Sequence, residues 1–348
     1  MTRLRHVDCS EPGWTRRRCG RGFVYFDEHD RRLETEAVAR IRALAIPPAW
    51  TQVWICSRPN GHLQATGWDA AGRKQYLYHP AWRVQRDRDK FDHMLVFARS
   101  LPNLRTQVRG DLDSGDLTRE QVLACAAHLL DIGFFRIGSE GYAEDNHTYG
   151  LATMLKSHVR VMGDTVVFDY PAKGSKRRVQ SVVDPVVSTI VSRLKSRRGG
   201  GQELLAFRGP ASGSRGRWID VTSEDINDYL KAATGVACSA KDFRTWNATV
   251  LAAVALAVGA PAASPRTRAR RVRAAVDEVA HYLGNTPAVA RASYIDRRVI
   301  DRYLAGDAIV VPLSAFGRPT EPGGLCIQGP IEEAVLALLE DCQPPLAA

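Results

Sequence analysis

The chain has 348 residues, a formal net charge of +10, and only eight lysines among its 48 basic residues. This length predicts two domains, and the surplus of arginine, whose planar fork of donors matches phosphate oxygens, favours nucleic acid as the partner. Seven cysteines without a Cys-x-x-Cys pair argue against a disulfide framework and a structural zinc site. The longest apolar run, which begins at Val250, is too short to span a membrane. No apolar stretch follows the basic N-terminus, so we expect a cytoplasmic protein.

The first 85 residues predict a small β-rich domain. The sequence GFVYF predicts a strand, and LETEAVARIRAL predicts a helix. Three apolar pieces separated by turn signals then predict a β-meander, namely QVWIC, HLQATGW and QYLYH. The pattern becomes helical between Pro80 and Arg88, so we assign 1–85 to this domain and 86–348 to a second one.

Residues 86–348 predict a mainly helical domain with a small hairpin sheet embedded in it, which makes the fold class α+β. Thr118 and Gln121 have the spacing of a capping box at the start of a helix. The sequences TSEDINDYLKAATG and AKDFRTWNATVLAAVALAV predict further helices. Alternating apolar residues around the turns at Gly163 and Gly174 predict the hairpins. The stretch GAPAASPRTRARR is expected to be an uncapped connector.

The segment YLGNTPAVARASYIDRRVI, residues 282–300, has the pattern of a helix start. Gly284 breaks the chain, Thr286 can cap a new helix, and Pro287 suits its first turn. Tyr294 follows among arginines, at a position where an apolar residue would usually mark the core. The simplest interpretation of this segment alone is a half-buried tyrosine with a solvated hydroxyl.

Five scattered residues suit one reaction when they are taken together: Arg136, Lys173, Arg244, Asn285 and Tyr294. Each also has an ordinary structural interpretation as a helix end, a solvated turn residue or a cap. A phenol can attack a phosphodiester if guanidinium and amide groups neutralise the phosphate oxygens and a lysine protonates the departing oxygen. This chemistry needs no metal. The sequence has no Gly-Lys-Ser/Thr phosphate loop for ATP, and its acidic cluster DLDSGD is typical of a solvated turn.

The order and spacing of these motifs resemble a type IB DNA topoisomerase of the small bacterial and poxvirus kind. The resemblance covers nearly the whole chain and rests on GHLQATGWDAAGRKQYLYHPAWR, RIGSEGYAEDNHTYGLATM, the Lys173 hairpin, KDFRTW and LGNTPAVARASYI. It implies that a monomer clamps duplex DNA at the nucleoid without a cofactor, nicks one strand, holds its 3′ end on Tyr294 and reseals it. The family's catalytic positions fall on the five residues named above. Asn285 stands where poxvirus members have His, and an amide cannot act as an acid or base.

The resemblance also implies DNA contacts outside the catalytic positions. Gln75, Tyr76 and Tyr78 match positions that contact the major groove, where an amide can bind a base edge and tyrosines can contact sugar, phosphate or thymine methyl groups. Another interpretation of this stretch is an edge strand protected by polar residues. The remaining candidates for DNA binding are Arg73, Lys74, Tyr142, Thr153 and Lys241.

Two other functions remain open at this point. A tyrosine recombinase or integrase resembles this family in its catalytic fold and chemistry, but it usually carries His-x-x-Arg where this chain has Lys241-Asp-Phe-Arg244. A non-enzymatic DNA-binding protein would keep the arginine-rich surface without needing Lys173 and Tyr294 together.

Overall fold

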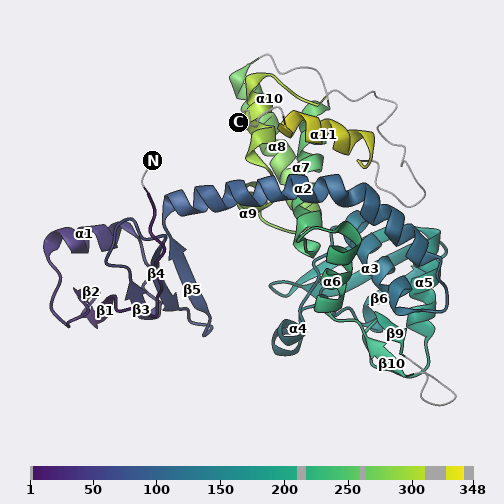
Figure 1. Ribbon diagram of the computed structural model, residues 1–348, viewed down its shortest axis with the longest axis horizontal. Coiled ribbons are helices and arrows are strands. Elements are labelled where there is room, and N and C mark those ends of the chain that lie inside the picture. The colour runs from purple at the N-terminus through teal and green to yellow at the C-terminus, as the bar shows by residue number, and fades with distance from the viewer. Residues whose placement is uncertain (1–2, 210–216, 259–263, 310–326, 341–348) are drawn as a thin grey trace. The chain divides into compact units, whose positions relative to one another are not determined.

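The computed structural model describes residues 3–209, 217–258, 264–309 and 327–340 (Figure 1). The chain divides into two compact units, Met1–Asp92 and His93–Ala348. The division lies within a single long helix, α2 (Pro80–Leu112), and the domain boundary predicted at 85/86 falls in the same helix.

The described part of the first unit is built on a five-stranded antiparallel sheet with the strand order β2-β1-β3-β4-β5. Its elements are β1 (Trp14–Cys19), β2 (Gly22–Phe26), α1 (Thr35–Ala43), β3 (Thr51–Ile55), β4 (Leu63–Trp68) and β5 (Lys74–Tyr78). The predicted meander is confirmed as β3, β4 and β5. Strand β1 was not predicted, because its sequence WTRRRC has little apolar alternation. Its Arg16 instead donates to the carbonyls of Pro47 and Trp50 at 2.7 and 2.9 Å.

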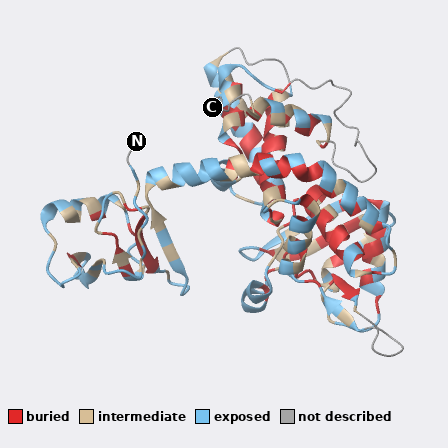
Figure 2. Cartoon of the chain, in the orientation of Figure 1, coloured by how far each residue is buried: buried red, intermediate tan, exposed pale blue. Residues whose placement is uncertain are grey.

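The core of the first unit lies between α1 and the sheet. Ile41 of α1 packs with Val53, Ile55 and Ala65 of the central strands, and Figure 2 shows β4 buried along nearly its whole length. On the edge strand β5, Leu77 faces this core. Because side chains alternate along a strand, the residues on either side of Leu77 face away from the core.

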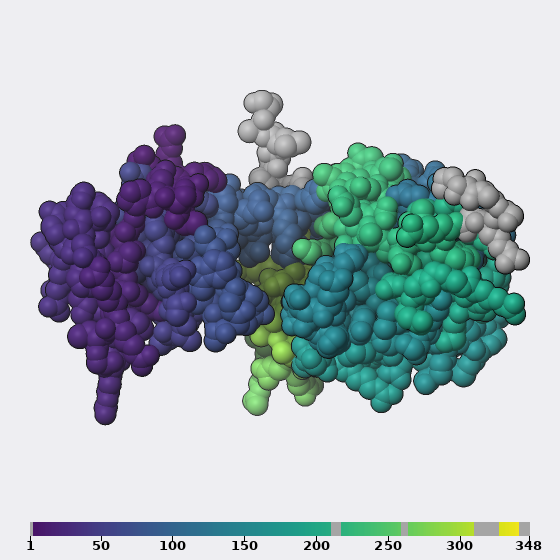
Figure 3. Space-filling view, turned by 90° about the horizontal axis from the view of Figure 1, so that it is seen from below, coloured from purple at the N-terminus to yellow at the C-terminus, as the bar shows by residue number. Residues whose placement is uncertain are grey.

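The described residues of the second unit form a mainly helical body with small sheets. Its helices are α3 (Arg119–Gly133), α4 (Glu140–Asn146), α5 (Pro185–Ser196), α6 (Ser223–Thr234), α7 (Ala240–Ala257), α8 (Pro265–Leu283), α9 (Pro287–Ser293), α10 (Arg297–Ala305) and α11 (Pro330–Glu340), with a 3-10 turn, η1 (Lys156–His158). Its strands are β6 (Val159–Met162), β7 (Thr165–Ala172) and β8 (Lys176–Val183), which pair in that order, and β9 (Ala206–Arg208) with β10 (Trp218–Asp220). The α+β class with an embedded hairpin sheet is confirmed, and Figure 3 shows this body, teal to green, with its side chains in place.

Helix α7 forms the centre of the second unit. Its Phe243 and Trp246 are fully buried, and Phe243 meets Phe97 of α2 edge to face at 5.0 Å between ring centroids. The Trp246 indole donates to Glu332 of α11 at 2.7 Å, and Glu332 also forms an ion pair with Arg105 of α2 at 2.6 Å. The last described helix is therefore tied to α7 and α2 by one buried carboxylate.

One segment differs from its prediction. Helix α8 begins at Pro265, inside the stretch that was expected to be an uncapped connector, and Ser264 caps it by accepting from the amide of Thr267 at 3.2 Å. The arginines of this stretch are good helix formers, and apolar residues spaced along the helix from Val272 to Leu283 are buried. The expectation of an uncapped connector was wrong for residues 264–271, and residues 259–263 of this stretch lie outside the described residues.

Candidate active site

The junction between α8 and α9 carries two of the five catalytic candidates. Gly284 ends α8 with a left-handed backbone, φ 61°, and Asn285 follows with its amide bonded to a carbonyl of the last helical turn at 2.9 Å. Thr286 caps α9, as predicted, by accepting from Val289 at 3.4 Å. Tyr294 is the residue at which α9 ends. One short helix therefore fixes the spacing between Asn285 and Tyr294.

The backbone around Tyr294 is anchored on α7. The hydroxyl of Thr249 is completely buried, lies 3.2 Å from the Tyr294 carbonyl oxygen, and accepts from the Asp296 amide at 3.1 Å. Arg244 precedes Thr249 by five residues on the same helix, and its guanidinium carbon lies 5.4 Å from the centroid of the Tyr294 ring. Helix α7 thus holds both the arginine and the backbone of the tyrosine. No sequence motif around Thr249 predicted that it anchors the backbone of Tyr294.

Arg244 is buried, with 3% of its surface exposed. Its Nη2 donates to the Leu283 carbonyl at 2.9 Å, and its Nη1 donates to the carbonyl of Phe134. Burial lowers the pKa of Arg244, and the neighbouring charge of Arg136 lowers it further. The cation is held in place by two carbonyl groups, and no carboxylate among the described residues forms an ion pair with it.

Arg136 lies in the loop after α3 and bonds directly to Asn285. Its Nη2 donates to Asn285 Oδ1 at 2.6 Å. The loop is fixed by two glycines in close approach, since a Cβ on Gly150 would lie 2.3 Å from the nitrogen of Gly138. Thr153 is buried beside them and accepts from the Gly150 amide at 3.0 Å. Thr153, proposed from the sequence as a DNA contact, therefore stabilises the loop that carries Arg136.

Two buried donors beside Tyr294 have no hydrogen-bond partner in the described structure: Arg244 Nε and Asn285 Nδ2. Burial alone would raise the pKa of Tyr294. The charges of Arg244 and Arg136 and the nearby polar side chains of Arg244 and Asn285 outweigh burial, so the pKa of Tyr294 lies below its ordinary value. An unpaired buried donor costs free energy, so this site favours an anion with several acceptor oxygens.

Lys173 is not brought into this cluster. It lies in the turn between β7 and β8, is exposed, and makes no hydrogen bond or ion pair with the described residues. The turn continues through Gly174 and Ser175, both with positive φ. Four of the five candidates therefore meet, and the fifth is on a neighbouring hairpin tip.

Three of the proposed DNA contacts lie on one face of β5. Lys74, Tyr76 and Tyr78 alternate with core-facing Leu77. The two tyrosine rings stack with their centroids 6.2 Å apart, and the Lys74 ammonium lies 5.8 Å from the Tyr76 ring. Tyr76 is 45% exposed. This is a surface of aromatic rings with an adjacent cation.

The other two candidates of this region bond to Asp69 instead. Arg73 forms an ion pair with Asp69 at 3.0 Å, and Gln75 Nε2 donates to the same carboxylate at 2.9 Å. In the second unit, Tyr142 of α4 and Lys241 in the first turn of α7 are exposed. Their contacts with DNA remain predictions.

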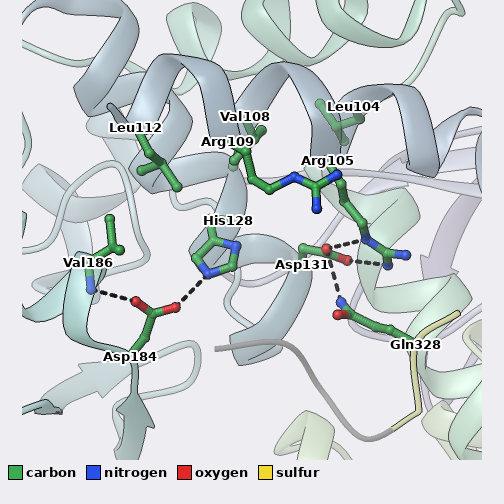
Figure 4. Close-up of a pocket in the computed structure, with 11 residues that line it drawn as sticks. Leu104, Arg105, Val108, Arg109, Leu112, His128, Asp131, Asp184, Val186 and Gln328 are labelled. Carbon is green, nitrogen blue, oxygen red and sulfur yellow. Dashed lines mark hydrogen bonds and ion pairs between the residues drawn. The ribbon is translucent and has the colours of Figure 1, made fainter. Parts of the chain in front are cut away.

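A separate cavity of about 250 Å³ contains none of the five catalytic candidates (Figure 4). Its walls come from α2, α3 and the start of α5, and His128 Nε2 lies 2.8 Å from Asp184 Oδ2 at one side. Among the residues that the structure describes, no group of His, Cys, Asp and Glu is arranged to hold a metal ion. No helix in the described ranges is both long and apolar enough to cross a membrane.

Two family models match the chain. One, described as the catalytic core of eukaryotic DNA topoisomerase I, matches residues 79–303, and the other, described as the N-terminal domain of bacterial DNA topoisomerase IB, matches residues 22–69. A DNA topoisomerase 1B of Acanthamoeba polyphaga mimivirus is 26% identical over 284 residues, which are 81% of this chain and 84% of that protein. A DNA topoisomerase 1 of Mycosarcoma maydis is 28% identical over 199 residues, 51% of this chain and 19% of that protein. All five catalytic candidates lie within the first match.

Proposed function

The chain belongs to the type IB DNA topoisomerases, which relax supercoiled duplex DNA by cutting and resealing one strand, and we propose that Tyr294 forms the covalent bond to the DNA 3′ end. The observation that carries this proposal is the pair of unpartnered buried donors, Arg244 Nε and Asn285 Nδ2, beside the Tyr294 phenol. A phosphodiester placed there would satisfy both donors. Its phosphorus would then be next to the phenol oxygen that attacks it.

Each remaining residue has a distinct role in this proposal. Arg136 and Arg244 neutralise the phosphate oxygens, on which negative charge grows as the fifth bond to phosphorus forms. Asn285 donates a hydrogen bond from Nδ2, because its Oδ1 already accepts from Arg136. A fixed site of this kind stabilises the transition state without reorganising during the reaction.

Lys173 supplies the proton in this mechanism. The phenol of Tyr294 loses its proton to solvent and its oxygen forms a bond to phosphorus, while the bond from phosphorus to the 5′ oxygen breaks. The departing oxygen takes a proton from the Lys173 ammonium, and Lys173 regains a proton from solvent. Because Lys173 is exposed on a hairpin turn, this step requires DNA to bring the lysine to the 5′ oxygen. Religation is the reverse sequence, and the energy of the bond is conserved in the phosphotyrosine, so we expect no need for ATP or metal.

Binding to the duplex is proposed to involve the aromatic face of β5 in the first unit and Tyr142 and Lys241 in the second. Tyr76 and Tyr78 offer ring edges and hydroxyls to a groove, and Lys74 offers a charge to the backbone. We further propose that the enzyme clamps DNA as a monomer. Light scattering on the free protein can test the monomeric state. Its placement at the nucleoid in the cytoplasm is part of the same proposal.

The decisive variant is Tyr294→Phe, which removes one oxygen. After incubation with an end-labelled duplex and denaturation, the wild-type protein should remain attached to a DNA 3′ end and the variant should not. Noncovalent affinity for the duplex should stay within a few fold, because one hydroxyl contributes little to an interface of about 1,000 Å² or more. Adduct formation by Tyr294→Phe would remove Tyr294 from its role.

Plasmid relaxation tests the whole activity. In buffer with chelator and no nucleotide, the wild-type protein should remove both positive and negative supercoils. Recombinant circles without relaxation would instead indicate a tyrosine recombinase. DNA binding without either product would indicate a non-enzymatic protein.

A further inference from the structure

Three consecutive carbonyl groups at the end of α8 each accept a hydrogen bond from an arginine of a different element. The pairs are Arg178 with Tyr282 at 2.7 Å, Arg244 with Leu283 at 2.9 Å and Arg136 with Gly284 at 3.3 Å. The last carbonyls of a helix lack partners within the helix and carry the negative end of its dipole, so cations are favoured there. Two of these arginines belong to the proposed phosphate site. The third, Arg178 of β8, has no role so far.

Arg178 reaches this junction from the hairpin that carries Lys173. It pairs with Tyr170 across β7 and β8, and its Nε donates to Gln180 at 2.5 Å. Gln180 donates in turn to the carbonyl of Gly133 at 2.9 Å. A residue of its own strand thus holds the guanidinium, which also contacts α8.

Contact between Arg178 and the junction is close. A Cβ placed on Gly284 would lie 2.6 Å from Arg178 Nη1, so the guanidinium packs against the backbone of the residue just before Asn285. Burial lowers the pKa of Arg178, the charge of Arg136 adds to this effect, and Tyr170 opposes it. A second, half-buried cation near Arg136 has a cost that a purely structural contact would not need.

We infer that Arg178 is a positioning residue of this active site, which fixes the turn at Gly284 so that Asn285 presents its amide to the phosphate. This inference rests on the proposed role of Asn285. In this assignment Arg178 acts through the protein and not on DNA: its Nε and Nη2 bond to Gln180 and Tyr282, and its Nη1 packs against Gly284. It acts through Asn285, because it fixes the position of the Asn285 side chain relative to Arg136.

The test is a double-mutant cycle on the rate of single-turnover cleavage. Arg178→Ala should slow cleavage by about 10²-fold, the size of effect expected when a reacting group is misplaced by about 1 Å, with unchanged affinity for the duplex. If Arg178 acts through Asn285, the double variant Arg178→Ala/Asn285→Ala should be no slower than Asn285→Ala alone. If the double variant is slower than wild type by the product of the two single-variant factors, the inference is overturned. It is also overturned if Arg178→Ala cleaves within twofold of the wild-type rate.

Arg177 offers a matched control, since it is the next residue on β8, is exposed, and pairs with Asp169 at 2.6 Å on the strand surface. Arg177→Ala should cleave at the wild-type rate. Should Arg178→Ala not fold, Arg178→Lys keeps the charge but has its donors on a single nitrogen, and the same cycle with Asn285→Ala decides the question. The inference would also be overturned if Arg178→Ala reduced only the fraction of protein molecules that are active, and those molecules cleaved at the wild-type rate. Failure of Tyr294→Phe to abolish the adduct would instead refute the proposed nucleophile, which is a separate result.

Discussion

The guanidinium carbon of Arg244 lies 5.4 Å from the centroid of the Tyr294 ring. Each residue favours the charged form of the other. Burial disfavours the tyrosinate form of Tyr294, but the nearby cation more than offsets this effect and lowers its pKa. Burial also disfavours the charged form of Arg244. The tyrosine that we propose as the nucleophile therefore lies beside a cation that makes the loss of its proton easier.

This relationship predicts a pH profile. The ionisation of Tyr294 should have its midpoint below the ordinary tyrosine value of about 10, and Arg244→Ala should move the midpoint upward, because burial remains when the cation is removed. Tyrosinate absorbance, taken as the difference between each protein and its Tyr294→Phe partner, measures this midpoint without relying on catalysis. An unchanged midpoint in Arg244→Ala would contradict the electrostatic account.

The same shift has a defined effect on stability. Because the pKa of Tyr294 is lower in the folded state, its contribution is fully present above the pKa of the unfolded chain and is lost as pH falls through the folded-state pKa. The difference in free energy of unfolding between the wild-type protein and Tyr294→Phe should therefore grow as the pH rises through the folded-state pKa and level off above the unfolded-state pKa. Urea unfolding of both proteins at a series of pH values measures this difference, and a difference that does not change with pH would contradict the shift.

Thr249→Val should show how far α7 sets the position of Tyr294. Valine keeps the shape of the side chain but leaves the Asp296 amide without its acceptor, which should cost about 1–3 kcal/mol of stability. Cleavage should slow by roughly tenfold or more as the tyrosine backbone shifts. Thr245→Val is the matched control, because its buried hydroxyl donates to the Lys241 carbonyl one turn earlier and has no bond to the Tyr294 region in the described structure. Equal rates in both variants would show that the Thr249 contact does not position Tyr294.

The carboxylate of Glu332 should be important for the stability of the second unit. Burial disfavours the charge of Arg105, but Asp131 and Glu332 outweigh this effect and raise the pKa of Arg105. Removing one partner of such a buried pair typically costs about 3–5 kcal/mol, so urea unfolding should show a loss of this size for Glu332→Ala. Exposed Glu333 on the next position of α11 is the control. A Glu332→Ala variant as stable as Glu333→Ala would mean that the network contributes nothing net.

Salt dependence tests the proposed DNA surface of β5. Each phosphate contact adds about 0.9 to the slope of log affinity against log salt for duplex DNA, so Lys74→Ala should reduce the slope by about that amount. Arg31→Ala should not change it, because Arg31 is an exposed residue paired with Asp27 at 2.9 Å and has no proposed contact. If both variants have the wild-type slope, Lys74 does not contact phosphate.

The gathering of Arg136, Arg244, Asn285 and Tyr294 could be anticipated from the sequence only through the resemblance, since their local patterns are ordinary. The role of Arg178 was not predicted, because strand β8 reverses the usual pattern of apolar residues facing inward and polar residues facing solvent. Its inward positions carry Arg178 and Gln180, whereas Val179 is 56% exposed. A hydrophobic alternation would have assigned Arg178 to solvent.

The arginine-rich segments show the same limit. Strand β1, which carries Arg16, was not predicted, and the arginines that open α8 were expected in a connector, because charge and Pro are typical of loops. In the fold, Arg16 satisfies carbonyl groups, and α8 is stabilised by a buried stripe from Val272 onward. Which arginine turns inward depends on tertiary partners that no local pattern specifies.

The assignment of Lys173 as the acid can be separated from a role in positioning. Lys173→Ala should slow cleavage of an ordinary strand by about 10² to 10⁴-fold, the usual range for losing a general acid. When sulfur replaces the bridging 5′ oxygen, the thiolate leaves without a proton, so this substrate should restore most of the rate in Lys173→Ala. It should not restore Arg244→Ala, which lacks the buried cation that we propose to stabilise the pentacoordinate phosphorus. Lys176, exposed on the same hairpin, provides a control variant that should need no rescue. Rescue of both Lys173→Ala and Arg244→Ala, or of neither, would mean that Lys173 only orients the phosphate, because a missing proton is the one defect that sulfur corrects.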